Sequence, residues 1–132
     1  MQSTLQLSIF VENKPGTLAA ICEALTKAKI NIYGMTISDT VDHSVIRLVL
    51  SDPRKALNLF EERGVLVVEN EVIVIENANK PGAMADVAHK LEKAKVNIEY
   101  AYLATHPKAK TGLAILRVSD TKKGLKALGK KK

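Results

Sequence analysis

The sequence predicts an α+β protein built from two tandem ferredoxin-like βαββαβ units with antiparallel sheets, the second of which lacks its last strand. Three observations predict this fold. First, one segment of the 132 residues occurs twice. Second, each copy alternates runs typical of strands with runs whose apolar residues have helical spacing. Third, turn residues separate these runs at matching places in the two copies. We expect one unit to span residues 1–69 and the other to span residues 70–132.

The repeat is clearest at a four-residue motif, Asn-Lys-Pro-Gly. It occurs at Asn13–Gly16 and again at Asn79–Gly82, and residues 13–32 match residues 79–98 at 11 of 20 positions. Farther along, Ser51-Asp52 matches Ser119-Asp120 at an offset of 68 instead of 66. The second copy therefore carries two extra residues, which we place within 105–112.

The first copy begins with a strand and a helix. Residues 5–11 are apolar and β-branched enough for a strand. Pro15 suits the first position of a helix, because its missing N–H costs nothing there. The apolar stripe that follows has helical spacing and predicts a buried helix face, formed by Leu18, Ile21, Cys22, Leu25 and Ala28.

The rest of the first copy predicts two strands, a helix and a last strand. Asp52 and Pro53 mark the start of the helix, Leu57 and Phe60 point inward from it, and Gly64 ends it. The strands are expected at residues 30–37, 45–50 and 65–68.

The second copy repeats this order but stops early. Its helical stripe consists of Met84, Val87, Ala88, Leu91 and Ala94, and after Leu128 only a glycine and three lysines remain. The sheet edge left without a fourth strand needs a cover, which is either a neighbouring subunit or a strand shared through residues 65–75. We expect strands at 72–75, 97–103 and 113–118, and helices from Pro81 and near 121–128.

Composition restricts the class of protein. Hydrophobic residues make up 46% and charged residues 26%, as in a soluble globular protein. No apolar run approaches the ~18 residues of a membrane-spanning helix, and the N-terminus does not resemble a signal peptide. The single cysteine, Cys22, excludes an internal disulfide and a cysteine-built zinc site. These features predict a cytoplasmic protein with no membrane partner.

The net charge of +6 lies entirely in the second half. Residues 1–66 carry 7 basic and 7 acidic residues, whereas residues 67–132 carry 13 and 7, and six of those 13 lie between Lys122 and Lys132. We expect a solvated basic tail; contact with nucleic acid or with an acidic partner is the alternative.

The duplicated motif resembles the ACT domain family. In both copies Asn-x-Pro-Gly stands between a first strand and an apolar helix, and Asn-Ile opens the second strand, at Asn31 and at Asn97. The resemblance covers the whole chain. It implies a small regulatory module that binds an amino acid and is attached to, or partners, a metabolic enzyme. It also implies that ligand lies at a junction between units, contacted by Asn13 with Asn97, or by Asn79 with Asn31.

The physical chemistry of the motif also favours a ligand site. A helix N-terminus has unpaired N–H groups and partial positive charge, so it suits a carboxylate. Glycine in the first turn lets a ligand approach, and an asparagine amide can accept from an ammonium group and donate to a carboxylate. The expected ligand contacts come from both copies of the motif and its neighbours: Asn13, Lys14, Pro15, Gly16, Thr17, Leu18, Asn31, Asn77, Asn79, Gly82, Ala83, Met84 and Asn97.

A purely structural role for the same residues is the alternative. Asparagine before Lys-Pro forms turns with its own backbone, and Asn31 and Asn97 can satisfy backbone groups where a strand begins. Some serine-binding relatives have histidine two residues before the loop asparagine, where this chain has Val11 and Asn77, so we expect the two copies to bind differently. Glu99 would favour a cationic ligand if it faced the site, although an exposed strand position is expected.

Other chemistries find little support in the sequence. His43, His89 and His106 have no metal-ligand spacing, and we expect no metal and no cofactor. No carboxylates converge for acid–base catalysis and no phosphate-binding loop occurs, so we expect no enzyme activity. RNA binding is disfavoured because the strands at 45–50 and 113–118 contain no aromatic residue.

We therefore expect a non-catalytic regulatory protein, forming a homodimer, that binds an amino acid at the interface between its units. A change of orientation or of oligomeric state would carry the signal to a metabolic enzyme. The alternative is an assembly module that binds no small molecule and works through protein contact alone.

Overall fold

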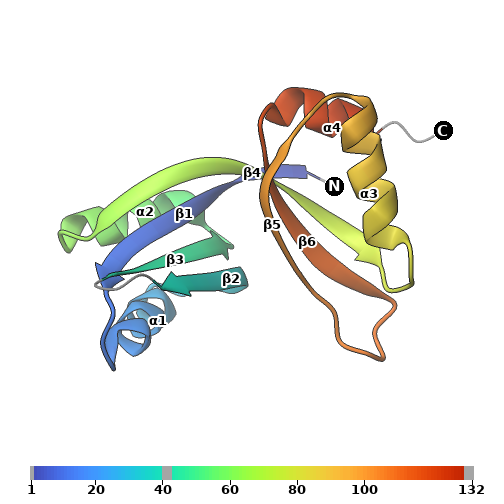
Figure 1. Cartoon of the computed structure of the whole chain (residues 1–132). Helices are drawn as coiled ribbons and strands as arrows, with labels where there is room; N and C mark the ends of the chain where they lie inside the picture. Colours follow the sequence, from blue (N-terminus) through green and yellow to red (C-terminus); the bar gives the residue numbers. More distant parts are fainter. Residues whose placement is uncertain (1, 40–42, 130–132) are drawn as a thin grey trace. The chain divides into compact units, whose positions relative to one another are not determined.

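The computed structural model describes residues 2–39 and 43–129. Within these residues the chain forms six strands and four helices (Figure 1). In chain order they are β1 (Gln2–Glu12), α1 (Thr17–Lys27), β2 (Ile32–Asp39), β3 (His43–Leu50), α2 (Pro53–Glu62), β4 (Leu66–Ala78), α3 (Ala83–Lys93), β5 (Ile98–Ala104), β6 (Thr111–Val118) and α4 (Thr121–Gly129).

The strands form a six-stranded sheet in the order β2-β3-β1-β4-β6-β5. β3 pairs antiparallel with both β1 and β2, and β6 pairs antiparallel with both β4 and β5. Each half thus has the strand order of a split βαβ unit, with the crossover helices between non-adjacent strands. The predicted α+β class and the tandem organisation are confirmed.

The chain divides into two compact units. The first-repeat unit consists of residues 5–70, and the second-repeat unit consists of residues 71–129 together with residues 2–4. No strand follows α4 in the described part of the chain, and the N-terminal residues 2–4 of β1 belong to the second-repeat unit instead. The predicted boundary between residues 69 and 70 stays a prediction, because β4 runs through it without a break.

The prediction of two separate strands at 65–68 and 72–75 is wrong. β4 continues from Leu66 to Ala78 through the polar residues Glu69, Asn70 and Glu71, which look like a turn in the sequence. β4 has β1 and β6 as its neighbours in the sheet, and its pairing with β6 runs from Ile73 to Ala78, so the sheet favours an extended backbone along this strand. β4 is itself the strand whose edge was expected to need a cover, and its neighbour on that side is β1, whose residues 2–4 belong to the second-repeat unit.

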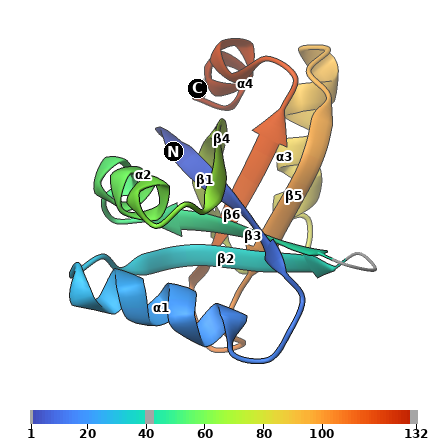
Figure 2. The ribbon, with the colours of Figure 1, turned by 90° about the vertical axis from the view of Figure 1, so that its left-hand side faces the viewer.

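In the first-repeat unit, α1 and α2 pack against the same face of the sheet (Figures 1 and 2). Alternate residues of β1 and β3 point to this face, and the helices cover them with their apolar stripes. Phe60 on α2 is fully buried, as predicted, and Leu57 is partly buried against the core. The buried cluster includes Leu7, Ile9, Ile21, Leu25, Ile46, Leu48, Leu50, Ala56 and Phe60.

The second-repeat unit has a matching core. α3 and α4 cover one face of β4 and β6, and Met84 and Ala94 are partly buried at its margin. Ala88, which we predicted on the buried stripe, is exposed because it lies just outside the face that α3 turns to the sheet. The buried cluster includes Ile73, Val87, Leu91, Val96, Ala114, Leu116, Val118 and Leu128.

Both motif helices begin later than the prolines predicted. α1 starts at Thr17 and α3 at Ala83, and each is preceded by a glycine in the left-handed region, Gly16 at φ 90° and Gly82 at φ 89°. The prolines lie one residue before these glycines, in the turn that leads to the helix. A positive φ is easily adopted only by glycine, so the motif needs its last residue for backbone geometry. None of the helices in the described part of the chain is both long and apolar enough to cross a membrane.

Candidate functional site

The first motif forms a corner between β1 and α1 (Figure 2). Gly16 caps α1 through its backbone carbonyl, which accepts from the N–H of Ala20 over 3.0 Å. No side chain caps this helix in the described part of the chain. The N–H of Thr17 donates to the carbonyl of Lys14 over 3.4 Å. The next N–H groups of the first turn, with the positive end of the helix dipole, are available to an anionic group.

A small cavity lies beside this corner. Its volume is about 110 Å³, roughly that of four liquid waters. Asn13, Thr17 and Ser44 bring polar side chains to its wall, and Ser44 is buried. The apolar part of the wall comes from Val11, Leu18, Ile37 and Ile46.

Asp39 contributes a carboxylate to the corner, which the sequence analysis missed. The side-chain amide of Asn13 donates a hydrogen bond to Oδ1 of Asp39 over 2.6 Å, and the hydroxyl of Ser44 donates to the same oxygen over 3.5 Å. Asn13 and Ser44 both line the cavity, so the carboxylate stands next to it. The strand order could have predicted this contact. β3 pairs antiparallel with both β1 and β2, and this brings the last residue of β2 close to the end of β1.

The second motif uses its asparagine differently. The side-chain amide of Asn79 faces the carbonyl oxygens of His106, Pro107 and Ala109, at 3.3, 3.3 and 2.7 Å. The N–H of Asn79 also donates to the carbonyl of Lys110 over 2.9 Å. These partners belong to the β5–β6 loop, which contains the two extra residues of the second copy. Asn79 therefore holds that loop in place.

Two further substitutions distinguish the second corner. Gly112 stands where the first copy has Ser44, and a Cβ atom on Gly112 would lie only 2.0 Å from the hydroxyl of Thr105. Thr105 itself stands where the first copy has Asp39. The second corner thus lacks both the carboxylate and the buried hydroxyl of the first. The two copies thus differ at their corners; the expectation that they bind differently stays a prediction.

The other predicted residues of the second motif lie along α3 and β4. The amide of Asn77 is 3.6 Å from the sulfur of Met84. Asn77 and Ala83 line a cavity of about 430 Å³ in the second-repeat unit.

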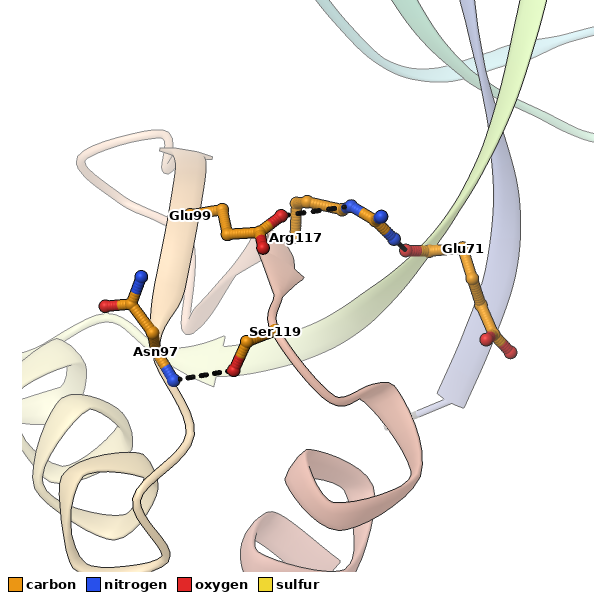
Figure 3. Close-up of polar contacts among 5 residues, drawn as sticks. All are labelled: Glu71, Asn97, Glu99, Arg117 and Ser119. Atoms are coloured by element: carbon orange, nitrogen blue, oxygen red, sulfur yellow. Dashed lines mark hydrogen bonds and ion pairs between the residues drawn. The ribbon is translucent and has the colours of Figure 1, made fainter.

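Asn31 and Asn97 lie where β2 and β5 begin, and their backbones are fixed by a duplicated serine contact. The N–H of Asn97 donates to the hydroxyl of Ser119 over 3.0 Å, and the N–H of Ser119 donates to the carbonyl of Asn97 over 2.9 Å (Figure 3). Asn31 and Ser51 make the same pair of contacts, at 2.8 and 2.9 Å.

These two asparagines do not join the corner of their own unit. Asn31 precedes β2, whereas Asp39 at its far end contacts Asn13, so the length of the strand, about 26 Å, separates them. The contact of Asn13 with Asn97, or of Asn79 with Asn31, around one ligand stays a prediction.

Glu99 does not serve as a free carboxylate. Its Oε1 atom lies 3.3 Å from Nε of Arg117, and Nη1 of Arg117 donates to the carbonyl of Glu71 over 3.0 Å (Figure 3). Arg117 thus links β5 to β4 across β6. Glu99 is an exposed strand residue, as expected, and it forms an ion pair with Arg117.

The histidines occupy unrelated positions. His43 begins β3, Nδ1 of His89 lies 3.3 Å from Oε1 of Glu92 on α3, and His106 is in the β5–β6 loop. Across residues 2–39 and 43–129 no three His, Cys, Asp or Glu side chains gather as metal ligands would.

Comparisons with known proteins agree with the architecture. A family model described as an ACT domain pair matches residues 2–132. No curated protein matches the sequence. The crystal structure of protein BT0572 from Bacteroides thetaiotaomicron is 33% identical, with a TM-score of 0.88, over 96% of this chain and 86% of that one.

The regulatory subunits of two aspartate kinases share the fold. The ligand-free subunit from Thermus thermophilus has a TM-score of 0.69 at 15% identity, over 97% of this chain and 95% of that one. The subunit from Thermus flavus has a TM-score of 0.61 at 17% identity, with the same coverage of 97% and 95%.

Proposed function

The chain belongs to the ACT domain pair family, and we propose that it is a non-catalytic regulatory protein that binds a small amino acid at the corner of its first repeat. The observation that supports this proposal is that Asn13 and Ser44, which line the cavity of about 110 Å³, both donate to the carboxylate of Asp39, while the start of α1 borders the same cavity. The charged residues of the lining itself, Glu12 and Lys14, form an ion pair over 3.1 Å. The uncapped first turn of α1 suits a carboxylate, and Asp39 suits an ammonium group.

The size and the lining of the cavity define the ligand class. A volume of about 110 Å³ holds few non-hydrogen atoms, so glycine, alanine and serine are the expected candidates. The hydroxyls of Thr17 and Ser44 favour a polar side chain, and Leu18 and Ile46 supply the apolar part of the wall. Among the three, serine fits best, because its hydroxyl can form hydrogen bonds with those of Thr17 and Ser44.

The signal would be a population shift. A ligand that binds one arrangement of the ACT units, or one oligomeric state, more tightly than another shifts the chain toward it. Devices of this kind have coupling free energies of about 1–3 kcal/mol. The aspartate kinase regulatory subunits share this fold, and we propose a metabolic enzyme as the recipient of the signal.

Thermal unfolding of the full chain against the twenty amino acids tests the proposal. A ligand at 100 times its Kd stabilises the folded state by about 2.7 kcal/mol, which a melting curve detects readily. We expect serine, alanine or glycine to raise Tm, and Asn13→Ala to abolish the rise. If no amino acid shifts Tm and Asn13→Ala behaves like the parent, the receptor function is wrong.

An assembly module remains a second candidate because of one edge strand. β2 ends the sheet, and Tyr33, Met35 and Ile37, which share a face by alternation, are 58%, 39% and 43% exposed. Apolar edge strands are templates for pairing with another chain. Under this candidate, Met35→Lys converts an oligomer to a monomer in light scattering, and added amino acids leave the mass unchanged.

A further inference from the structure

The two helices of the second-repeat unit carry an excess of positive charge. α3 and α4 lie side by side on one face of the sheet (Figure 1). Their sequences contain five lysines and two acidic residues, whereas α1 and α2 of the first-repeat unit contain three basic and three acidic residues. The helix pair therefore has a net charge of +3 in the second copy and of zero in the first.

All five lysines of this helix pair are exposed to solvent. They are Lys90 and Lys93 on α3 and Lys122, Lys123 and Lys126 on α4. Within residues 2–39 and 43–129 none of their ammonium groups forms an ion pair or a hydrogen bond. Three further lysines, at 130–132, follow in the sequence and lie outside the described residues. The positive charge of this surface is thus free to meet another molecule.

The first copy uses its equivalent positions differently. Lys55 in the first turn of α2 donates from Nζ to the carbonyl of Ala28, at the end of α1, over 2.8 Å. Lys123 corresponds to Lys55 at the offset of 68 and makes no such contact in the described part of the chain. The acidic Glu61 of α2 corresponds to Gly129. The second copy has therefore lost both a structural use of the lysine and a compensating carboxylate.

Helix stability does not explain the lysines at the start of α4. The N-terminus of a helix carries partial positive charge, so a cation placed there is unfavourable. Lys122 and Lys123 nevertheless lie in the first turn, and that turn contains no acidic residue. These two cations are better explained by contact with a molecule outside the helix.

The composition of the surface favours phosphate groups over a protein or a membrane. The exposed residues of α3 and α4, which the structure describes in full, include no Trp, Tyr, Phe, Met or Arg. Such residues are enriched in protein interfaces, from which lysine is depleted. Leu125 and Leu128 pack on the core, so α4 has no leucine left to enter a bilayer. Lysine binds phosphate as a point charge.

We propose that α3 and α4 form a binding surface for double-stranded nucleic acid, which they contact through its phosphate groups without reading the base sequence. Lys122 and Lys123 lie four and three residues before Lys126, so the three ammonium groups share one side of α4. Contacts of this kind release counterions from the duplex. They differ from base stacking on aromatic strand residues, which the sequence disfavours. The surface is also independent of the ligand site at the first-repeat corner.

Fluorescence anisotropy with the full chain tests the proposal. The probes are two fluorescein-labelled DNA duplexes of about 20 base pairs with unrelated sequences, because phosphate contacts carry no sequence information. We expect a Kd of about 1–100 µM near physiological salt, and log Kd should rise linearly with log salt. The two duplexes should bind equally within about threefold. No binding at about 50 mM salt, or a larger preference for one duplex, would contradict the proposal.

Two variants remove the same amount of charge from different places. The test variant replaces the lysines of α4: Lys122→Ala, Lys123→Ala and Lys126→Ala. The control variant replaces exposed cations of the first-repeat unit: Lys27→Ala, Arg54→Ala and Arg63→Ala. The test variant should lower the salt slope by about 2.7 and raise Kd roughly tenfold or more at about 50 mM salt. The control should bind within about threefold of the parent. Alanine favours helix, so both variants should fold.

The outcomes separate the alternatives. Equal losses of affinity in the two variants would mean that net charge alone attracts DNA, and an unchanged salt slope in the test variant would remove α4 from the surface. Tighter binding of poly-L-glutamate would assign the surface to an acidic protein, and tighter binding of phosphatidylserine vesicles would assign it to a membrane; either result overturns the proposal. A rise of Tm with serine in a chain that binds no DNA would leave the proposed function standing while this surface fails.

Discussion

Asn13 and Asp39 are 26 residues apart in the chain, yet the side-chain amide of Asn13 donates a hydrogen bond to Oδ1 of Asp39 over 2.6 Å. The contact joins the corner that follows β1 to the last residue of β2. It fixes the asparagine amide and places a carboxylate opposite the positive end of α1. In the second copy Thr105 stands in place of Asp39, and Asn79 turns to backbone carbonyls instead.

Replacing Asp39 by asparagine should weaken ligand binding without unfolding the protein. The amide keeps an oxygen that accepts from Asn13 but loses the charge that favours an ammonium group, so we expect about a tenfold rise in Kd. Calorimetric titration with serine measures the change. Glu62→Gln, an exposed charge on α2 distant in sequence from the corner, is the control. Equal affinities of the parent and Asp39→Asn would remove Asp39 from the site.

Asn79→Ala and Asn13→Ala should have different consequences although the two residues are repeat equivalents. Asn79 holds the β5–β6 loop, and its loss leaves carbonyl groups without a donor, which should cost about 1 kcal/mol of unfolding free energy. Asn13 is exposed and contacts one exposed carboxylate, so its loss should stay within about 0.5 kcal/mol.

Hydrogen exchange separates these two variants further. The amides of His106, Lys108, Ala109 and Lys110 should exchange faster in Asn79→Ala and at the parent rate in Asn13→Ala, because Asn79 contacts that loop and Asn13 does not. Equal exchange in both variants would mean that the loop holds its own conformation and that Asn79 does not fasten it.

The fold was predictable because its signals are local and occur twice. Asp52 was expected to start a helix, and its side chain accepts from the N–H of Lys55 over 3.1 Å. Asp120, its repeat equivalent, accepts from the N–H of Lys123 over 3.0 Å. A helix cap depends only on residues a few positions apart, so the sequence shows the capping residue directly before the helix that it caps.

The features that escaped prediction depend on distant pairing. β4 crosses Glu69, Asn70 and Glu71 as a strand because neighbouring strands satisfy its backbone. Asp39 joins the corner because β3 lies between β1 and β2 and pairs with both. Neither feature can be predicted from a short stretch of sequence. Residue patterns indicate burial and turns, but they do not show which strands become neighbours in the sheet.

Gly16→Ala should destabilise the protein through backbone conformation alone. Nothing lies within 4 Å of a Cβ atom added at this position, so no clash contributes. The φ of 90° nevertheless disfavours any side chain, and we expect a loss of about 1–2 kcal/mol in chemical denaturation. Asparagine tolerates this conformation better than alanine, so Gly16→Asn should recover part of the loss. Equal losses for alanine and asparagine would contradict the backbone explanation.

Asp120→Ala should destabilise the second-repeat unit through the start of α4. The Asp120 carboxylate accepts from the N–H of Lys123, one of the N–H groups that the helix itself cannot pair. Loss of such a cap costs about 1 kcal/mol, measured as a lower denaturation midpoint. Serine also caps helices, so Asp120→Ser should lie close to the parent. A denaturation midpoint of Asp120→Ala equal to that of the parent would contradict the capping role of this carboxylate.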